Sequence, residues 1–119
     1  MKFKVASGLQ IVTSTWGSKN DPVVILLHGG GQTRHAWGST GEKLSQSGFY
    51  VVALDLRGHG DSDWDSNGDY SIDAYKYDLA SIIQQLDKPA SLVGASLGGM
   101  ASLSLAGDSK TRALCSALV

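Results

Sequence analysis

The stretch LVGASLGGM, residues 92–100, decides the fold, because a strand pattern ends in it and a helical pattern begins in it. Residues 90–93 are mostly apolar and are predicted to form a short strand, while residues 97–106 are predicted to form an apolar helix that Gly107 can close. A G-x-S-x-G motif, with its serine at position 96, lies between the two. Glycine and serine are both abundant in this chain, so the motif alone is weak evidence. Its place in a strand–turn–helix segment makes it informative.

In this setting Ser96 is predicted to be a nucleophile. A serine in such a sharp turn has a strained backbone, and glycine on both sides keeps bulk away from it. The turn aims the hydroxyl outward at the carboxyl edge of the sheet, where open α/β folds bind their ligands. The backbone N–H of Leu97, at the start of the helix, can point at a developing oxyanion. The alternative is an ordinary turn serine beside packing glycines.

The rest of the chain alternates strand patterns with helix patterns. The first two strand patterns flank Ser7-Gly8, a hairpin signal, and the later ones are apolar without alternation, as in parallel sheets buried on both faces. Ser71 is placed to cap the most regular helix. The predicted strands are 2–7, 9–16, 23–27, 49–54, 90–93 and 113–119, and the predicted helices are 38–47, 72–86 and 97–106. This order predicts an α/β fold, a mainly parallel sheet flanked by helices, with an N-terminal β-hairpin.

The last predicted strand, residues 113–119, has no helix after it to cover that end of the sheet. A strand of buried type left at a sheet edge promotes association. We therefore expect residues 1–119 to be the N-terminal part of a single longer domain, and we expect the isolated chain to self-associate.

A second glycine-rich motif, HGGG at residues 28–31, follows the buried strand 23–27 and opens a loop. A glycine-rich backbone there can turn its N–H groups toward a substrate oxygen. The alternatives are a flexible loop or a phosphate-binding loop. The chain has neither a Gly-Lys-Ser/Thr sequence nor a complete G-x-G-x-x-G, so a phosphate loop is not supported and no cofactor is expected.

Three motifs in this order, HGGG at 28–31, DLRGHGDS at 55–62 and GASLGG at 94–99, resemble the α/β-hydrolase superfamily over nearly the whole chain. The resemblance implies an incomplete α/β-hydrolase fold in which the C-terminal strands and any lid are missing. It implies that Ser96 is the nucleophile and that the N–H groups of Gly30 and Leu97 form the oxyanion hole. Residues 55–62 become a structural loop beside the site, shaped by Arg57 and His59. The candidates for the pocket or its loops are His28, Gly29, Gly31, His35, Trp37 and His59.

The serine at the turn narrows the chemistry that the resemblance implies. Haloalkane dehalogenases and most epoxide hydrolases of the superfamily have aspartate at this position. Serine fits acyl transfer on a small ester, lactone or related carbonyl substrate. The pattern also resembles the esterase, enol-lactonase and cofactor-free haloperoxidase branches.

A serine hydroxyl needs a base, and in this family an acid and then a histidine follow the serine along the chain. After Ser96 the only acid is Asp108, which reads as a surface acid at a helix end, and there is no histidine. His28 and His59 are alternative bases, because triads are defined by geometry. We expect the acid and the histidine beyond residue 119 and little turnover from residues 1–119 alone. The alternative function is a non-catalytic fragment or a ligand-binding module without turnover.

Composition and charge argue against several other classes of protein. The net charge of −1 and the lack of a basic patch argue against nucleic-acid or membrane-surface binding. Without an apolar signal core at the start, and with Cys115 as the only cysteine, a cytoplasmic location is expected. Residues 63–69 resemble a calcium loop, but the twelfth position is Ala74 instead of glutamate, so a polar turn is predicted and no metal site.

Overall fold

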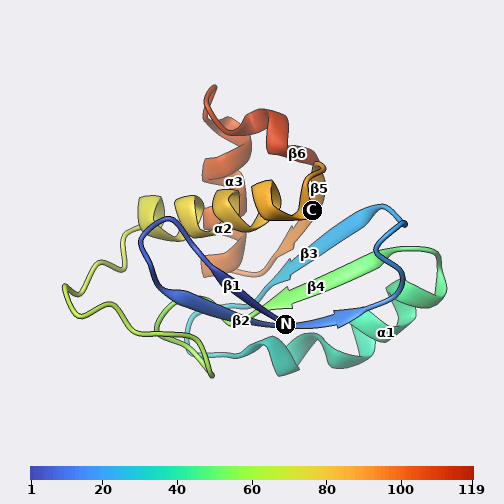
Figure 1. Cartoon of the computed structure of the whole chain (residues 1–119), viewed down its shortest axis with the longest axis horizontal. Coiled ribbons are helices and arrows are strands. Elements are labelled where there is room, and N and C mark those ends of the chain that lie inside the picture. The colour runs from blue at the N-terminus through green and yellow to red at the C-terminus, as the bar shows by residue number, and fades with distance from the viewer.

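Six strands form one mixed sheet in the computed structural model, which describes residues 1–119 (Figure 1). The strands are β1 (Lys2–Lys4), β2 (Gln10–Trp16), β3 (Val23–Leu27), β4 (Tyr50–Leu54), β5 (Ala90–Gly94) and β6 (Cys115–Leu118). Their order across the sheet is β1-β2-β4-β3-β5-β6. The hairpin β1–β2 joins the sheet antiparallel to β4, whereas β4, β3, β5 and β6 run parallel. The predicted mainly parallel sheet with an N-terminal hairpin is confirmed.

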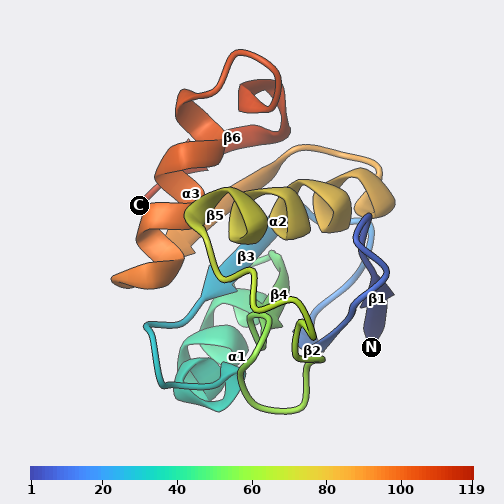
Figure 2. The same ribbon diagram turned by 90° about the vertical axis from the view of Figure 1, so that its left-hand side faces the viewer.

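Three α-helices and two short 3₁₀ helices connect the strands: η1 (Arg34–Trp37), α1 (Gly38–Gln46), α2 (Ile72–Leu86), α3 (Leu97–Gly107) and η2 (Arg112–Leu114). Helices α2 and α3 cover one face of the sheet and α1 covers the other (Figures 1 and 2). Helix α2 has the predicted bounds, and the Ser71 side chain accepts from the Ala74 N–H at 3.2 Å. The last strand starts later than predicted, at Cys115, because residues 112–114 form η2. No helix is long and apolar enough to cross a bilayer.

Burial on both faces of the sheet explains the apolar strands. In β3, Ile25 and Leu27 belong to the larger core cluster, which includes side chains of α2 and α3. Val24 and Leu26 belong to a smaller cluster on the opposite face, against which Leu44 of α1 packs. Successive residues of a strand point to opposite faces, so a strand covered on both sides must be apolar throughout.

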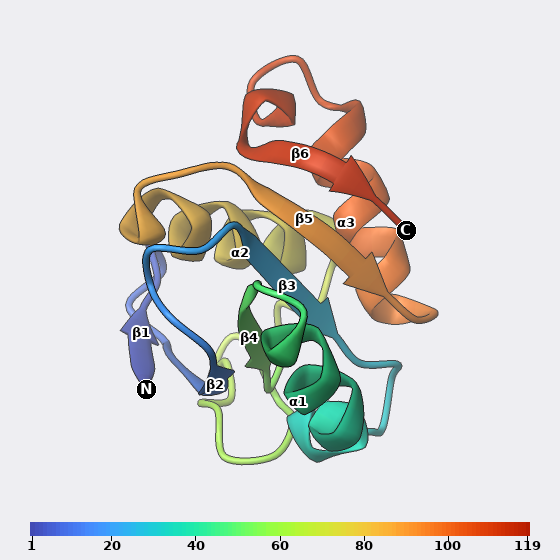
Figure 3. The same ribbon diagram turned by 90° about the vertical axis from the view of Figure 1, so that its right-hand side faces the viewer.

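The chain turns sharply between β5 and α3 (Figure 3). Ser96 has φ 51° and ψ −109°, a left-handed backbone conformation that residues other than glycine rarely adopt. A Cβ atom at Gly94 would lie 2.5 Å from the backbone of Gly98, and one at Gly98 would collide with the Leu27 carbonyl group. The Gly98 N–H donates to the His28 carbonyl oxygen at 3.2 Å. The glycines therefore let α3 begin directly against the end of β3.

We predict that Gly98→Ala lowers the free energy of unfolding by about 1 to 3 kcal/mol, because overpacking pushes α3 away from β3. Gly107→Ala is the matched control in the same helix, since a Cβ there meets nothing within 4 Å. The helix propensity of alanine is more favourable than that of glycine by about 1 kcal/mol, so Gly107→Ala is expected to be neutral or slightly stabilising. Urea unfolding monitored by circular dichroism measures both variants. Equal unfolding free energies for Gly98→Ala and the parent protein would contradict the close contact between α3 and β3.

The two edges of the sheet differ in charge. At one edge, β1 exposes Lys2 and Lys4, which discourage pairing with another strand. At the other edge, β6 has no partner on its outer side, carries no charged residue and exposes Ser116, Ala117 and Leu118. This second edge is open to another strand.

We expect the isolated 119-residue chain to associate through β6. Ala117→Lys places a charge on this edge and is expected to shift the chain toward monomer. Ala113→Lys adds the same charge at an exposed position of η2, outside the edge, and is expected to leave the association unchanged. Size-exclusion chromatography with light scattering measures the mass. A monomeric parent chain across the concentration range would show that this edge does not pair.

Candidate active site

Ser96 lies at the carboxyl end of β5, directly before the first residue of α3, and its side chain is exposed. Its left-handed backbone costs about 1 to 3 kcal/mol for a residue other than glycine. The hydroxyl makes no capping hydrogen bond to α3. The N–H of Leu97, at the first position of the helix, has no acceptor within the helix. The turn therefore presents a hydroxyl and a neighbouring free amide together at the positive end of a helix.

The glycine loop, residues 29–31, leaves one of its three amides free. The Gly29 N–H donates to Gln32 Oε1 at 3.0 Å, and the Gly31 N–H donates to His59 Nε2 at 3.0 Å. The Gly30 N–H between them donates to no group of the chain, and Gly30 is exposed. The unpaired amide is thus the middle one.

The direction of the Gly30 amide follows from the carbonyl group of the same peptide bond. The Gly29 carbonyl oxygen lies 2.7 Å from Nδ1 of the buried His28 ring and accepts from the Gln32 N–H at 3.1 Å. All peptide bonds of the chain are trans. In a trans peptide the N–H and the carbonyl point in opposite directions, so the Gly30 N–H points away from the buried ring of His28.

Hydrogen bonds fix the tautomer of His28. The Leu56 N–H donates to His28 Nε2 at 3.0 Å, so Nδ1 carries the proton and donates to Gly29. Burial lowers the pKa of His28, which favours the neutral ring. Both ring nitrogens are occupied, which leaves His28 no free nitrogen to take a proton from Ser96.

Both ring nitrogens of His59 are also hydrogen-bonded to backbone groups. Its Nδ1 lies 2.9 Å from the Arg57 carbonyl oxygen, to which it donates, while Nε2 accepts from Gly31. The ring centroids of His28 and His59 are 4.9 Å apart. The structure thus brings the HGGG motif and His59 together, but it leaves neither imidazole a free nitrogen for Ser96.

The ion pair between Asp55 and Arg34 anchors the loop 55–62 that carries His59. The buried Asp55 carboxylate pairs with the Arg34 guanidinium and accepts from the backbone N–H groups of Arg34 at 2.7 Å and Asp61 at 2.9 Å. Burial alone raises the pKa of Asp55, but these hydrogen bonds outweigh it and lower the pKa overall. The loop is therefore tied to the start of η1.

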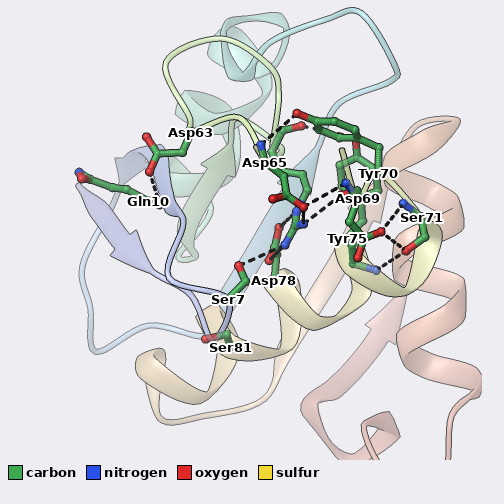
Figure 4. Close-up of polar contacts among 12 residues, drawn as sticks. Ser7, Gln10, Asp63, Asp65, Asp69, Tyr70, Ser71, Tyr75, Asp78 and Ser81 are labelled. Carbon is green, nitrogen blue, oxygen red and sulfur yellow. Dashed lines mark hydrogen bonds and ion pairs between the residues drawn. The ribbon is translucent and has the colours of Figure 1, made fainter. Parts of the chain in front are cut away.

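Arg57 connects the same loop to α2. Its guanidinium makes two hydrogen bonds to Asp78, of 2.6 and 2.7 Å, and donates to the Asp69 carbonyl oxygen at 3.0 Å. The hydrogen bonds with Asp78 raise the pKa of Arg57, which stays charged. Asp65 and Ser7 also contact the Arg57 guanidinium, beside its pair with Asp78 (Figure 4). These residues line a cavity of about 400 Å³ between the hairpin and α2. Arg57 is thus a structural cation whose hydrogen bonds are taken up by the protein.

The two remaining pocket candidates, His35 and Trp37, lie in η1. His35 is exposed in η1, and Trp37 packs against the small core cluster that contains Val24 and Leu26. Ser96, Gly30 and Leu97 line none of the four cavities of the structure. Residues 1–119 therefore present an open site without an enclosed substrate pocket.

The acidic residues of the loop 63–69 and Asp108 accept hydrogen bonds from backbone N–H groups or form ion pairs. Asp108 binds Lys76 of α2 at 2.9 Å and accepts from the Lys110 N–H at 2.9 Å. In the loop resembling a calcium site, Asp63 accepts from the Gln10 N–H at 2.8 Å (Figure 4). Asp65 accepts from the N–H groups of Asn67 and Asp69. These carboxylates close turns and join segments of the chain.

Two residues that shape the site carried weak signals or none. Asp78 is a charged residue on the apolar stripe of α2, between Tyr75 and Leu79, which marks it as a partner for a buried cation. Gln32, the acceptor for Gly29, follows the glycine loop in a polar segment and no pattern singles it out.

Comparison with known proteins agrees with the resemblance that the motifs indicate. A family profile described as alpha/beta hydrolase fold matches residues 22–119. An esterase of Mycobacterium tuberculosis is 40% identical over 92 residues, which is 76% of this chain and 30% of the esterase. The chain thus spans about a third of the length of this curated relative.

Two solved structures share the fold. A thioesterase domain from the curacin biosynthetic pathway has a TM-score of 0.87 and 33% identity, covering 99% of this chain and 43% of that domain. An epoxide hydrolase from Vigna radiata has a TM-score of 0.82 and 29% identity, covering 88% of this chain and 34% of that enzyme. Together with the family profile, these matches show that the chain belongs to the α/β-hydrolase family.

Proposed function

We propose that this protein is a serine hydrolase that transfers the acyl group of a small ester, lactone or related carbonyl substrate to water. The observation that carries the proposal is the combination of an exposed Ser96 on a strained turn and the unpaired N–H of Gly30. The esterase and thioesterase among the similar proteins support acyl chemistry for this family member.

In the proposed reaction, Ser96 Oγ attacks the carbonyl carbon and gives its proton to a base. The carbonyl oxygen becomes an oxyanion, which accepts hydrogen bonds from the N–H groups of Gly30 and Leu97. Collapse of this intermediate breaks the bond to the leaving alkoxide, which takes the proton from the base. Water then gives a proton to the base and attacks the acyl-serine to form a second oxyanion. Collapse of this intermediate releases the carboxylic acid, and the base returns the proton to Ser96 Oγ.

The serine at the turn favours acyl transfer over epoxide opening. Attack by a serine oxygen on an epoxide carbon would leave an ether, which water does not cleave under mild conditions. Attack on an ester leaves another ester, which the same oxyanion hole helps water to hydrolyse. The fold is shared with an epoxide hydrolase, but Ser96 supports ester or thioester chemistry.

In this reaction the general base and its acid come from beyond residue 119. Both ring nitrogens of His28 and His59 are occupied by backbone groups, and Asp108 is paired with Lys76. The same observation favours a second candidate for residues 1–119 by themselves, which is a fragment or ligand-binding module without turnover.

A phosphonate probe tests the serine assignment in the complete gene product. We predict that the parent protein is labelled and that Ser96→Ala abolishes labelling, because the probe forms its bond with an activated serine. Ser109→Ala is the matched control, since this serine is exposed and lies beyond the C-terminal end of α3. Intact mass spectrometry measures the adduct.

Labelling of Ser96→Ala at the parent's rate would overturn the nucleophile assignment. A parent protein that takes no label would favour the non-catalytic candidate. Residues 1–119 alone are expected to label far more slowly than the complete protein, because catalysis by the oxyanion hole without the triad is modest.

A further inference from the structure

We propose that His59 is a positioning residue that holds the glycine loop 29–31 in the conformation that leaves the Gly30 N–H free for the substrate oxyanion. This inference rests on the proposed function. It assigns to His59 a task distinct from proton transfer, since its two ring nitrogens bind backbone groups.

Gln32 and His28 hold the Gly29 side of the glycine loop, but the part after the Gly30 amide has little besides His59 to hold it in place. A Cβ added at Gly30 or Gly31 would meet nothing within 4 Å, so no packing fixes the backbone there. Gly31 also has φ 79°, in a region where glycine moves with little cost. The hydrogen bond from the Gly31 N–H to His59 Nε2, at 3.0 Å, is therefore the contact that fixes the far side of the Gly30 amide.

His59 can accept this hydrogen bond only when Nε2 is unprotonated. The Arg57 carbonyl oxygen, 2.9 Å from Nδ1, keeps the proton on Nδ1 and so selects the accepting tautomer. Arg57 is itself immobilised by its ion pair with Asp78, and its carbonyl oxygen also accepts from the Tyr75 hydroxyl at 3.4 Å. Through these contacts α2 holds His59, and His59 holds the loop that carries the oxyanion donor.

Three substitutions separate this task from a general packing role. His59→Gln keeps an acceptor near the place of Nε2, whereas His59→Asn is polar but too short to reach Gly31. His59→Phe keeps a ring without any acceptor. The three variants are compared in the complete gene product with p-nitrophenyl acetate as substrate and phenylboronic acid as an analogue of the tetrahedral intermediate.

We expect His59→Phe and His59→Asn to lower kcat about tenfold to a hundredfold, with KM within about twofold of the parent, because the donor acts on the transition state. The inhibition constant for phenylboronic acid should rise with the fall in kcat. His59→Gln should retain most of the parent's kcat. This pattern requires an acceptor at Nε2, so a loss of packing would not produce it.

Two outcomes would overturn the inference in different ways. If the parent takes the phosphonate probe and hydrolyses the ester, but His59→Asn and His59→Phe keep the parent's kcat, His59 does not position the loop. If the parent does neither, the proposed function fails and this inference fails with it. Circular dichroism verifies that each variant is folded, and if the phenylalanine variant is not, the comparison of asparagine with glutamine decides.

Discussion

The direct contact between Gly98 and the end of β3 is the constraint on which the site depends. The Gly98 N–H donates to the carbonyl oxygen of His28, and the space above Leu27 admits no side chain at residue 98. This contact places the first turn of α3 beside the start of the HGGG motif. It joins the βα connection that carries Ser96, the proposed nucleophile, to the one that carries the unpaired Gly30 amide, although the two segments are far apart in the sequence.

The second constraint is the supply of hydrogen-bond acceptors to the glycine loop. A run of three glycines has no side chains to pack, so its conformation depends on where its amides and carbonyls find partners. His28, His59 and Gln32 supply these partners, and together they leave only the Gly30 amide unpaired. The two imidazoles thus act by hydrogen bonding to the backbone, and the ion pairs of Asp55 and Arg57 fix the loop 55–62.

Much of the fold could be predicted from the sequence because its signals are local. Apolar runs without alternation gave the central strands, and the capping Ser71 with its apolar stripe gave α2 at its observed bounds. The start of β6 was predicted too early, since a run such as Ala113-Leu114-Cys115 does not distinguish a 3₁₀ turn from a strand.

The contacts of the candidate site could be predicted from the sequence less completely than the fold. Ser96 and the HGGG motif stand out because their backbone geometry requires specific residue types. The acceptors His59 and Gln32 are defined by contacts across the fold, so no pattern of spacing assigns them to particular amides. Trp37, a candidate for the pocket, packs against the core cluster on the α1 face of the sheet, a contact that no local pattern in the sequence defines.

The central claim is that Ser96, Gly30 and Leu97 form one nucleophile and oxyanion centre. A crystal structure of the complete gene product with a phosphonate bound to Ser96 tests it most directly. The account predicts that the phosphoryl oxygen lies about 2.7 to 3.1 Å from the backbone nitrogens of both Gly30 and Leu97. An adduct whose phosphoryl oxygen faces bulk water, or is bound by other groups, would contradict it.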